Sequence, residues 1–178
     1  MTFPMNIESL LPDTSRNTAD EAATFIMPHP DYLEQMIQLS FSDKKLMAMR
    51  ASRVILLIYY QQPELLKPHL DFMIDQLCES GNGSTIRNYL NLFRHETENL
   101  DEFRLGKLVN LSFNLLESPS SEIAHRSLAM EVLYKVSIKI PDFKDELKAL
   151  IELHYEEGTP AFKSTANKIL KKLNKEIF

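Results

Sequence analysis

Two short stretches of the sequence have residue types and spacings that could hold a metal ion. Glu122 and His125 stand three residues apart in a helical pattern, which places a carboxylate and an imidazole on one helix face. Di-metal carboxylate sites use this spacing, but they need a second Glu-x-x-His motif, and the sequence has none. His95 and Glu96 begin like the zinc-protease motif His-Glu-x-x-His, but Asn99 stands where the second histidine is required. The patterns therefore predict no metal and no other cofactor.

Nucleophilic and phosphate-binding chemistry have no better candidates. Cys78 is the only cysteine, so the chain can form neither an internal disulfide nor a thiolate cluster. Its apolar neighbours predict a residue that packs inside a helical core, since nothing near it in the sequence would activate a thiolate. The chain contains no G-x-G-x-x-G, no G-x-x-x-x-G-K-[ST] and no G-x-S-x-G motif. The sequence thus offers no catalytic residue.

The distribution of charge restricts the possible partners. The net charge is −5, and residues 1–42 carry all of this excess, with six acidic side chains and one basic side chain. The acidic balance and the absence of tryptophan argue against a dedicated nucleic-acid binder. A cluster of lysines near the end of the chain predicts a solvated helix face. The cluster comprises Lys163, Lys168, Lys171, Lys172 and Lys175.

The sequence shows no pattern typical of a signal peptide or a membrane span. The N-terminus lacks the basic region and long apolar core of a signal peptide. The most apolar run, Val54–Tyr60, is too short to cross a bilayer. We therefore expect a cytoplasmic protein with no membrane partner.

The elements that would position any site are expected to be helices. Only four glycines occur, while helix-forming residues are plentiful, and no stretch shows the alternation of a strand. Prolines and glycines divide the chain into about nine helical segments joined by short connections. Thr18 and Glu21 have the spacing of a capping box. Further predicted end signals are the N-caps Asp43, Ser121 and Thr159 and the left-handed helix ends Gly81 and Gly158.

The chain also repeats itself. The segments that begin at Asp43 and at Ser121 align at an offset of 78 residues. Aligned pairs are Ala51/Ala129, Val54/Val132, Ile55/Leu133, Ile58/Val136 and Pro63/Pro141. After one gap, an offset of 77 aligns Leu70/Leu147, Met73/Leu150, Ile74/Ile151, Gly81/Gly158 and Leu92/Ile169. Each copy holds two helix–turn–helix units of about 39 residues, the size of helical-pair repeats.

One motif carries a family resemblance. Its residues are Ser120, Glu122, Ile123, Arg126, Ala129, Val132 and Leu133. Together they resemble the second helix of a HEAT or armadillo-like repeat, with Arg126 at the basic position that Ala48 occupies in the earlier copy. The resemblance implies an all-α fold, a right-handed α–α superhelix of about four to five helical hairpins. We further expect an acidic lead-in at residues 1–17 and one solenoid domain at residues 18–178, and the resemblance implies that the second helices line a concave face.

Such a fold implies a small scaffold or adaptor that binds a protein or peptide in its concave groove. In the helix after Gly83, we expect Ile86, Tyr89, Leu90 and Phe93 to face the core. The predicted contact residues are Arg53, Arg87, Asn88, Asn91, Arg94, His125 and Asn167. The alternative for these residues is a solvated face without a partner. The residues themselves specify neither a particular partner nor an oligomeric state.

Two enzyme classes fit the sequence less well than a scaffold does. HEAT-like DNA-repair glycosylases acting on alkylated bases resemble the chain in size and architecture, but the acidic charge and the lack of tryptophan disfavour this alternative. Short HEAT-like chains are sometimes labelled as adenylosuccinate lyases. The lyase signature loop, which resembles S-S-x-M-P-x-K-x-N-P, is absent from the sequence.

Overall fold

The computed structural model describes residues 6–118 and 120–175. All regular structure in these two ranges is helical, with nine α-helices and no strand, which confirms the predicted all-α fold. The α-helices are α1 (Arg16–Ile26), α2 (Pro30–Leu39), α3 (Lys45–Gln61), α4 (Leu70–Glu79), α5 (Gly83–Phe93), α6 (Glu102–Glu117), α7 (Ile123–Lys139), α8 (Phe143–Leu153) and α9 (Pro160–Lys175). Short 3-10 helices lie at Ile7–Leu10, Pro63–Leu65 and Lys67–His69. The handedness of the superhelix stays a prediction.

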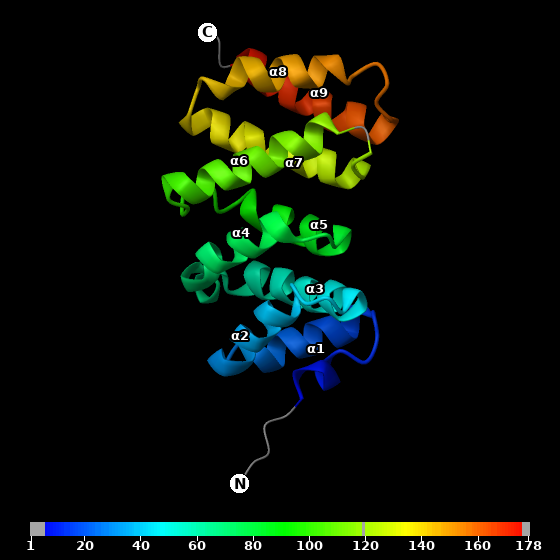
Figure 1. Cartoon of the computed structure of the whole chain (residues 1–178), viewed down its shortest axis with the longest axis vertical. Helices are drawn as coiled ribbons and strands as arrows, with labels where there is room; N and C mark the ends of the chain where they lie inside the picture. The colour runs from blue at the N-terminus through cyan, green and yellow to red at the C-terminus, as the bar shows by residue number, and fades with distance from the viewer. Residues whose placement is uncertain (1–5, 119, 176–178) are drawn as a thin grey trace. The chain divides into compact units, whose positions relative to one another are not determined.

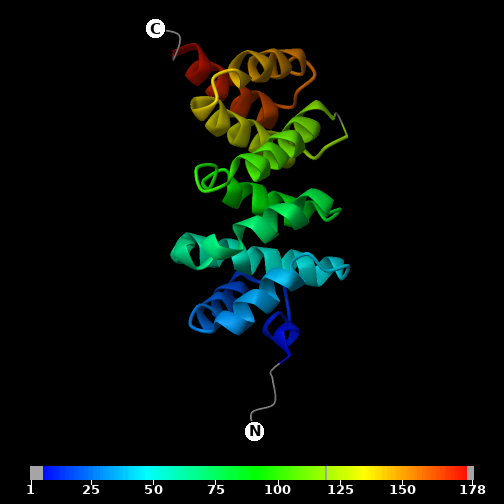
Figure 2. The same cartoon turned by 60° about the vertical axis from the view of Figure 1, so that its left-hand side comes forward.

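The helices belong to two compact units, Met1–Leu92 and Phe93–Phe178, which we call the N-terminal and C-terminal units. In the N-terminal unit, α3 packs against both α1 and α2 (Figure 2). In the C-terminal unit, α7 packs against α6, α8 and α9 (Figure 1). Helices α3 and α7 are therefore the central elements of their units. Their apolar side chains point in several directions because each helix has neighbours on several sides.

The internal repeat is visible in the burial of the aligned positions. On α3 and α7, four aligned pairs expose at most 1% of each side's surface. These pairs are Ala51/Ala129, Val54/Val132, Ile55/Leu133 and Ile58/Val136. The offset of 77 also aligns buried residues of α5 with buried residues of α9, at Thr85/Phe162, Tyr89/Ala166 and Leu92/Ile169. Leu150, the partner of buried Met73, is only half-buried. Both copies thus bury the same helix faces.

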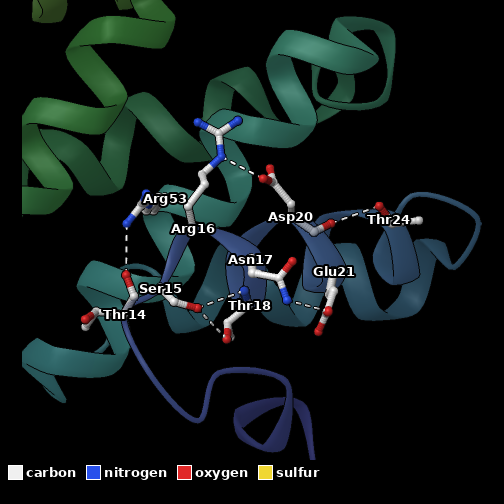
Figure 3. Close-up of polar contacts among 9 residues, drawn as sticks. All are labelled: Thr14, Ser15, Arg16, Asn17, Thr18, Asp20, Glu21, Thr24 and Arg53. Atoms are coloured by element: carbon white, nitrogen blue, oxygen red, sulfur yellow. Dashed lines mark hydrogen bonds and ion pairs between the residues drawn. The ribbon is translucent and has the colours of Figure 1, made fainter.

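The predicted capping box at the start of α1 is wrong. The helix begins at Arg16, and Ser15 is the N-cap, with its hydroxyl accepting a hydrogen bond from the Thr18 amide at 3.1 Å (Figure 3). The Asp13 carboxylate accepts hydrogen bonds from the Ser15 amide at 2.8 Å and from the Thr18 hydroxyl at 2.7 Å. These bonds hold the chain in a turn that starts the helix earlier than the capping-box spacing suggested.

Other end signals differ from the prediction as well. The N-caps of α3 and α7 are Lys44 and Glu122, neither of which makes a side-chain capping bond. Asp43 and Ser121 each precede these N-caps by one residue, outside the position from which a side chain caps the first turn. No described glycine has positive φ, so the expected left-handed ends at Gly81 and Gly158 are wrong too. The Thr159 cap is confirmed by its bond from the Phe162 amide at 3.3 Å.

Two glycines give opposite predictions for stability. A Cβ at Gly158 would lie 2.5 Å from a ring carbon of Phe162 and 3.1 Å from the Tyr155 carbonyl oxygen, whereas a Cβ at Gly106 in α6 would meet nothing within 4 Å. We expect Gly158→Ala to lower the free energy of unfolding by about 1–3 kcal/mol because the core must shift. Gly106→Ala should raise it by about 0.5–1 kcal/mol, since alanine favours the helix. Urea denaturation of both variants tests the pair, and equal shifts in the same direction would contradict it.

Candidate functional site

Four of the predicted contact residues line one groove of the N-terminal unit. This groove, which we call groove 1, has a volume of about 280 Å³. Arg53, Leu56 and Tyr60 of α3 form one side, and Arg87, Asn88 and Asn91 of α5 form another. The segment Leu11–Ala19 completes the lining. The repeat thus brings the predicted arginines and asparagines of two successive second helices to one place. The expected core residues of α5 are buried, except for Ile86, which is half-buried.

Arginines of α3 fix the wall of groove 1 that precedes α1. Arg50 donates a hydrogen bond from Nη1 to the Leu11 carbonyl oxygen at 2.7 Å. Arg53 donates from Nη1 to the Thr14 carbonyl oxygen at 3.0 Å, as Figure 3 shows. Both bonds attach the segment before α1 to the middle of α3 through main-chain carbonyl groups. Arg53 therefore has a structural bond in addition to its position beside the groove.

The α5 wall of groove 1 presents polar groups with unused bonding capacity. Asn88 donates from Nδ2 to the Ser52 hydroxyl at 2.9 Å, which fixes its side chain against α3. The Asn91 Oδ1 atom is buried without a hydrogen-bond partner. Arg87 is exposed, and its guanidinium forms no ion pair or hydrogen bond within residues 6–118 and 120–175. Tyr60, with 53% of its surface exposed, adds an apolar ring at the edge.

A second groove lies in the C-terminal unit between α7 and α9. This groove, which we call groove 2, has a volume of about 260 Å³. Its lining includes Arg94, another predicted contact residue, with His95 beside it. The other charged residues that line groove 2 are Glu131 and Lys135 of α7 and Lys168 and Lys172 of α9. Tyr134 and Ile169 supply apolar surface. Cations therefore outnumber carboxylates in groove 2, although the whole chain is acidic.

A comparison with protein families places this architecture. The HEAT repeat domain matches residues 7–173, nearly the whole chain. The chain belongs to the HEAT repeat family. A search of curated proteins and a search of solved structures each found no match. The resemblance inferred from the Arg126 motif is confirmed, and the fold is a helical repeat scaffold of the kind that commonly mediates protein interactions.

The two grooves occupy equivalent places in the HEAT repeat pattern. The offset of 78 that aligns α3 with α7 pairs Leu56 with Tyr134, and the offset of 77 that aligns α5 with α9 pairs Asn91 with Lys168. Arg53 is paired with Glu131. Arg53 donates to a carbonyl of the segment before α1, while Glu131 accepts from the Arg94 guanidinium in an ion pair. The aligned residues Arg53 and Glu131 thus each bond to a neighbouring segment of their own unit, Arg53 as a hydrogen-bond donor and Glu131 as an acceptor.

His125 does not lie where the sequence predicted. His125, one of the predicted contact residues, exposes only 4% of its surface and lines neither groove. Its Nε2 lies 3.8 Å from Glu122 Oε2, so the helical pairing of the two side chains is real. Within the residues described, no three His, Cys, Asp or Glu side chains gather as a metal would require. Asn167 is exposed on α9, but its Oδ1 accepts a hydrogen bond from the Tyr155 hydroxyl at 2.9 Å, and it lines neither groove.

Arg126, the basic residue of the HEAT motif, lies inside the C-terminal unit. It donates a hydrogen bond from Nε to the Leu116 carbonyl oxygen at 3.1 Å, and its guanidinium carbon lies 4.5 Å from the centre of the Phe162 ring. Burial lowers the pKa of Arg126 from its ordinary value, because desolvation penalises the charged form. The side chain therefore joins α6, α7 and α9 and is no groove contact.

Along the described helices, none is both long and apolar enough to cross a bilayer.

Proposed function

We propose that this HEAT repeat protein is a scaffold that binds a short extended segment of another protein in groove 1. Second helices of a solenoid present repeated side chains at regular spacing, which suits an extended ligand. Groove 1 combines an apolar surface with side-chain amides and an exposed guanidinium. An extended peptide offers the matching set of groups, since its backbone alternates amide donors and carbonyl acceptors between apolar side chains.

The unpaired Asn91 Oδ1 carries this proposal. Buried polar atoms in folded proteins nearly always have a hydrogen-bond partner, so an exception beside a groove indicates where a ligand atom would bond. A peptide amide supplies the donor that Oδ1 lacks. Arg87 can then pair with a peptide carbonyl or carboxylate, and the Tyr60 ring can cover an apolar side chain of the peptide.

The glycosylase alternative requires a carboxylate that is free to act on a flipped base. Asp13 is the only acidic residue among the described residues that line groove 1. Its hydrogen bonds from the Ser15 amide and from the side chains of Thr18 and Ser15 lower its pKa below the usual range, and they hold the turn before α1. A carboxylate engaged in this way supports the start of a helix. We therefore favour the peptide over the nucleic acid.

Asn91→Leu separates binding from folding. Leucine has nearly the shape of asparagine and removes the unpaired oxygen, so the free energy of unfolding should stay the same or rise by about 1 kcal/mol. Binding should weaken by about tenfold or more, because a buried peptide amide loses its acceptor. The measurement selects peptides from a random displayed library on the wild-type protein and titrates them by fluorescence anisotropy against wild type and variant.

Asn110→Leu is the matched control, since Asn110 is exposed on α6 and lines neither groove. It should leave the affinity for the selected peptides unchanged. Equal affinity of wild type and Asn91→Leu would overturn the proposal. Selection of no peptide, together with tight binding of duplex DNA that carries an alkylated base, would favour the glycosylase.

A further inference from the structure

Groove 2 has a different chemistry from groove 1. Arg94, Lys135, Lys168 and Lys172 surround a single carboxylate, that of Glu131. We propose that groove 2 is a second binding site, which takes an acidic peptide segment with an apolar side chain next to its carboxylates. This site lies wholly within Phe93–Phe178 and does not depend on groove 1.

The positive charges of groove 2 are only partly neutralised within the chain. Arg94 forms its ion pair with Glu131, and the Lys172 ammonium lies 4.9 Å from the centre of the Tyr134 ring. Lys135 on α7 and Lys168 on α9 are exposed and form no ion pair or hydrogen bond within the described ranges. These two ammonium groups belong to opposite walls of groove 2. Carboxylates of one ligand can therefore pair with both walls.

The apolar floor of groove 2 favours a ligand that carries an apolar group as well as negative charge. Tyr134 and Ile169 are buried under the charged rim and line the groove between the lysines. Inorganic phosphate would gain nothing from this apolar surface, whereas a peptide can place an aliphatic side chain on it. A single-stranded nucleic acid would need several exposed aromatic rings for base stacking. Apart from the His95 imidazole, the one aromatic ring that lines groove 2 among the described residues is that of Tyr134, which is buried and lies under Lys172, so we favour the acidic peptide.

His95 links this site to pH. Partial desolvation of the ring lowers its pKa, and the positive charges of Arg94 and Lys135 lower it further, against the opposing effect of Glu131 and Glu96. Arg94 donates from Nε to His95 Nε2 at 3.2 Å, which requires the neutral ring. Lys168 and Lys172 line the same groove from α9. Bound carboxylates would offset these cations, so the pKa of His95 should rise when the peptide binds.

The pH dependence follows with a defined sign. Because the pKa of His95 lies below its ordinary value in the free protein, lowering the pH through this pKa adds a positive charge to groove 2. The affinity for an acidic peptide should therefore rise as the pH falls from neutral through the lowered pKa of His95, while the peptide carboxylates stay ionised. NMR titration of the His95 ring with and without peptide measures the pKa directly. An unchanged pKa with the peptide bound would contradict the site.

The decisive comparison uses charge-matched variants of the full chain. The double variant Lys135→Gln and Lys168→Gln removes both free ammonium groups of groove 2. The double variant Lys171→Gln and Lys175→Gln removes the same charge from α9 at exposed residues that do not line groove 2. The probe is a fluorescent peptide that alternates Glu with Leu, and its Gln–Leu counterpart tests the need for carboxylates. We expect the first variant to weaken binding of the Glu–Leu peptide by about five- to tenfold.

The remaining outcomes decide for or against groove 2. The Lys171/Lys175 control and Asn91→Leu should bind the Glu–Leu peptide like the wild type, the latter because groove 1 belongs to the other unit. Equal weakening by both lysine pairs would show non-specific attraction and overturn the proposal. Equal binding of the Gln–Leu peptide would do the same. Tighter binding of a single-stranded oligonucleotide than of the peptide, lost with Lys135 and Lys168, would assign groove 2 to nucleic acid instead.

Discussion

Phe162→Ala is expected to lower the free energy of unfolding of the C-terminal unit by about 3–5 kcal/mol, the usual cost of emptying a large aromatic site. Phe162 exposes only 1% of its surface and stands in the first turn of α9, where it packs on the Arg126 guanidinium. Truncation removes this apolar area and leaves a cavity that the helices cannot close. Urea denaturation followed by circular dichroism measures the change.

Phe103→Ala is the matched control for this prediction. Phe103 exposes 68% of its surface at the start of α6, and its one described ring contact is the Lys107 ammonium at 4.8 Å. The control should change the free energy of unfolding by about 0.5 kcal/mol or less. Similar losses for the two variants would contradict the packing at Phe162.

Arg126→Ala should cost about 2–3 kcal/mol of unfolding free energy. The substitution removes the hydrogen bond to the Leu116 carbonyl and the stacking on Phe162. It leaves the carbonyl oxygen without this donor and creates a cavity. The Arg126 Nη2 atom is buried without a partner, so part of the arginine is itself unfavourably placed. Arg126→Met should therefore recover much of the loss, since methionine fills the space without a buried charge.

Arg87→Ala serves as the control for Arg126, because Arg87 is exposed on α5. It should leave the unfolding free energy within about 0.5 kcal/mol of the wild type. A double-mutant cycle of Arg126 and Phe162 then measures their coupling, which we expect at about 0.5–1.5 kcal/mol from the contact of guanidinium and ring. Additive losses would mean that the two side chains act separately.

The helical fold could be predicted from the sequence because it depends on periodic burial, and periodic burial leaves a pattern. Ala51 and Ala129 are fully buried at aligned positions, and so are Val54 and Val132. The helix ends were harder to predict, since a cap depends on local bonds that sequence spacing does not determine. The Asp13 carboxylate holds the turn before α1 by accepting bonds from Ser15 and Thr18, and the capping-box spacing of Thr18 does not predict these bonds.

The grooves were only partly predictable, for a related reason. Polar residues on the second helices could be named, and Arg53, Arg87, Asn88 and Asn91 do line groove 1 together. The burial of His125 was not predicted, because α7 packs against three helices and the comparison with α3 does not show which of its faces they cover. The sequence pattern did not predict the basic lining of groove 2, although Lys168 and Lys172 belong to the lysine cluster near the end of the chain. Aligning Lys168 with Asn91 of groove 1 through the offset of 77 could have found it.

One measurement tests most directly whether the second helices form the binding face. It records amide and side-chain NMR spectra of the isotope-labelled full chain during titration with a peptide selected on the wild-type protein. We predict that the largest shifts fall on Arg87, Asn88 and Asn91 of α5 and on Arg53 and Tyr60 of α3, with the Asn91 side chain prominent among them. Shifts confined to α2, α4, α6 and α8, with the residues of groove 1 unchanged, would contradict the proposed function.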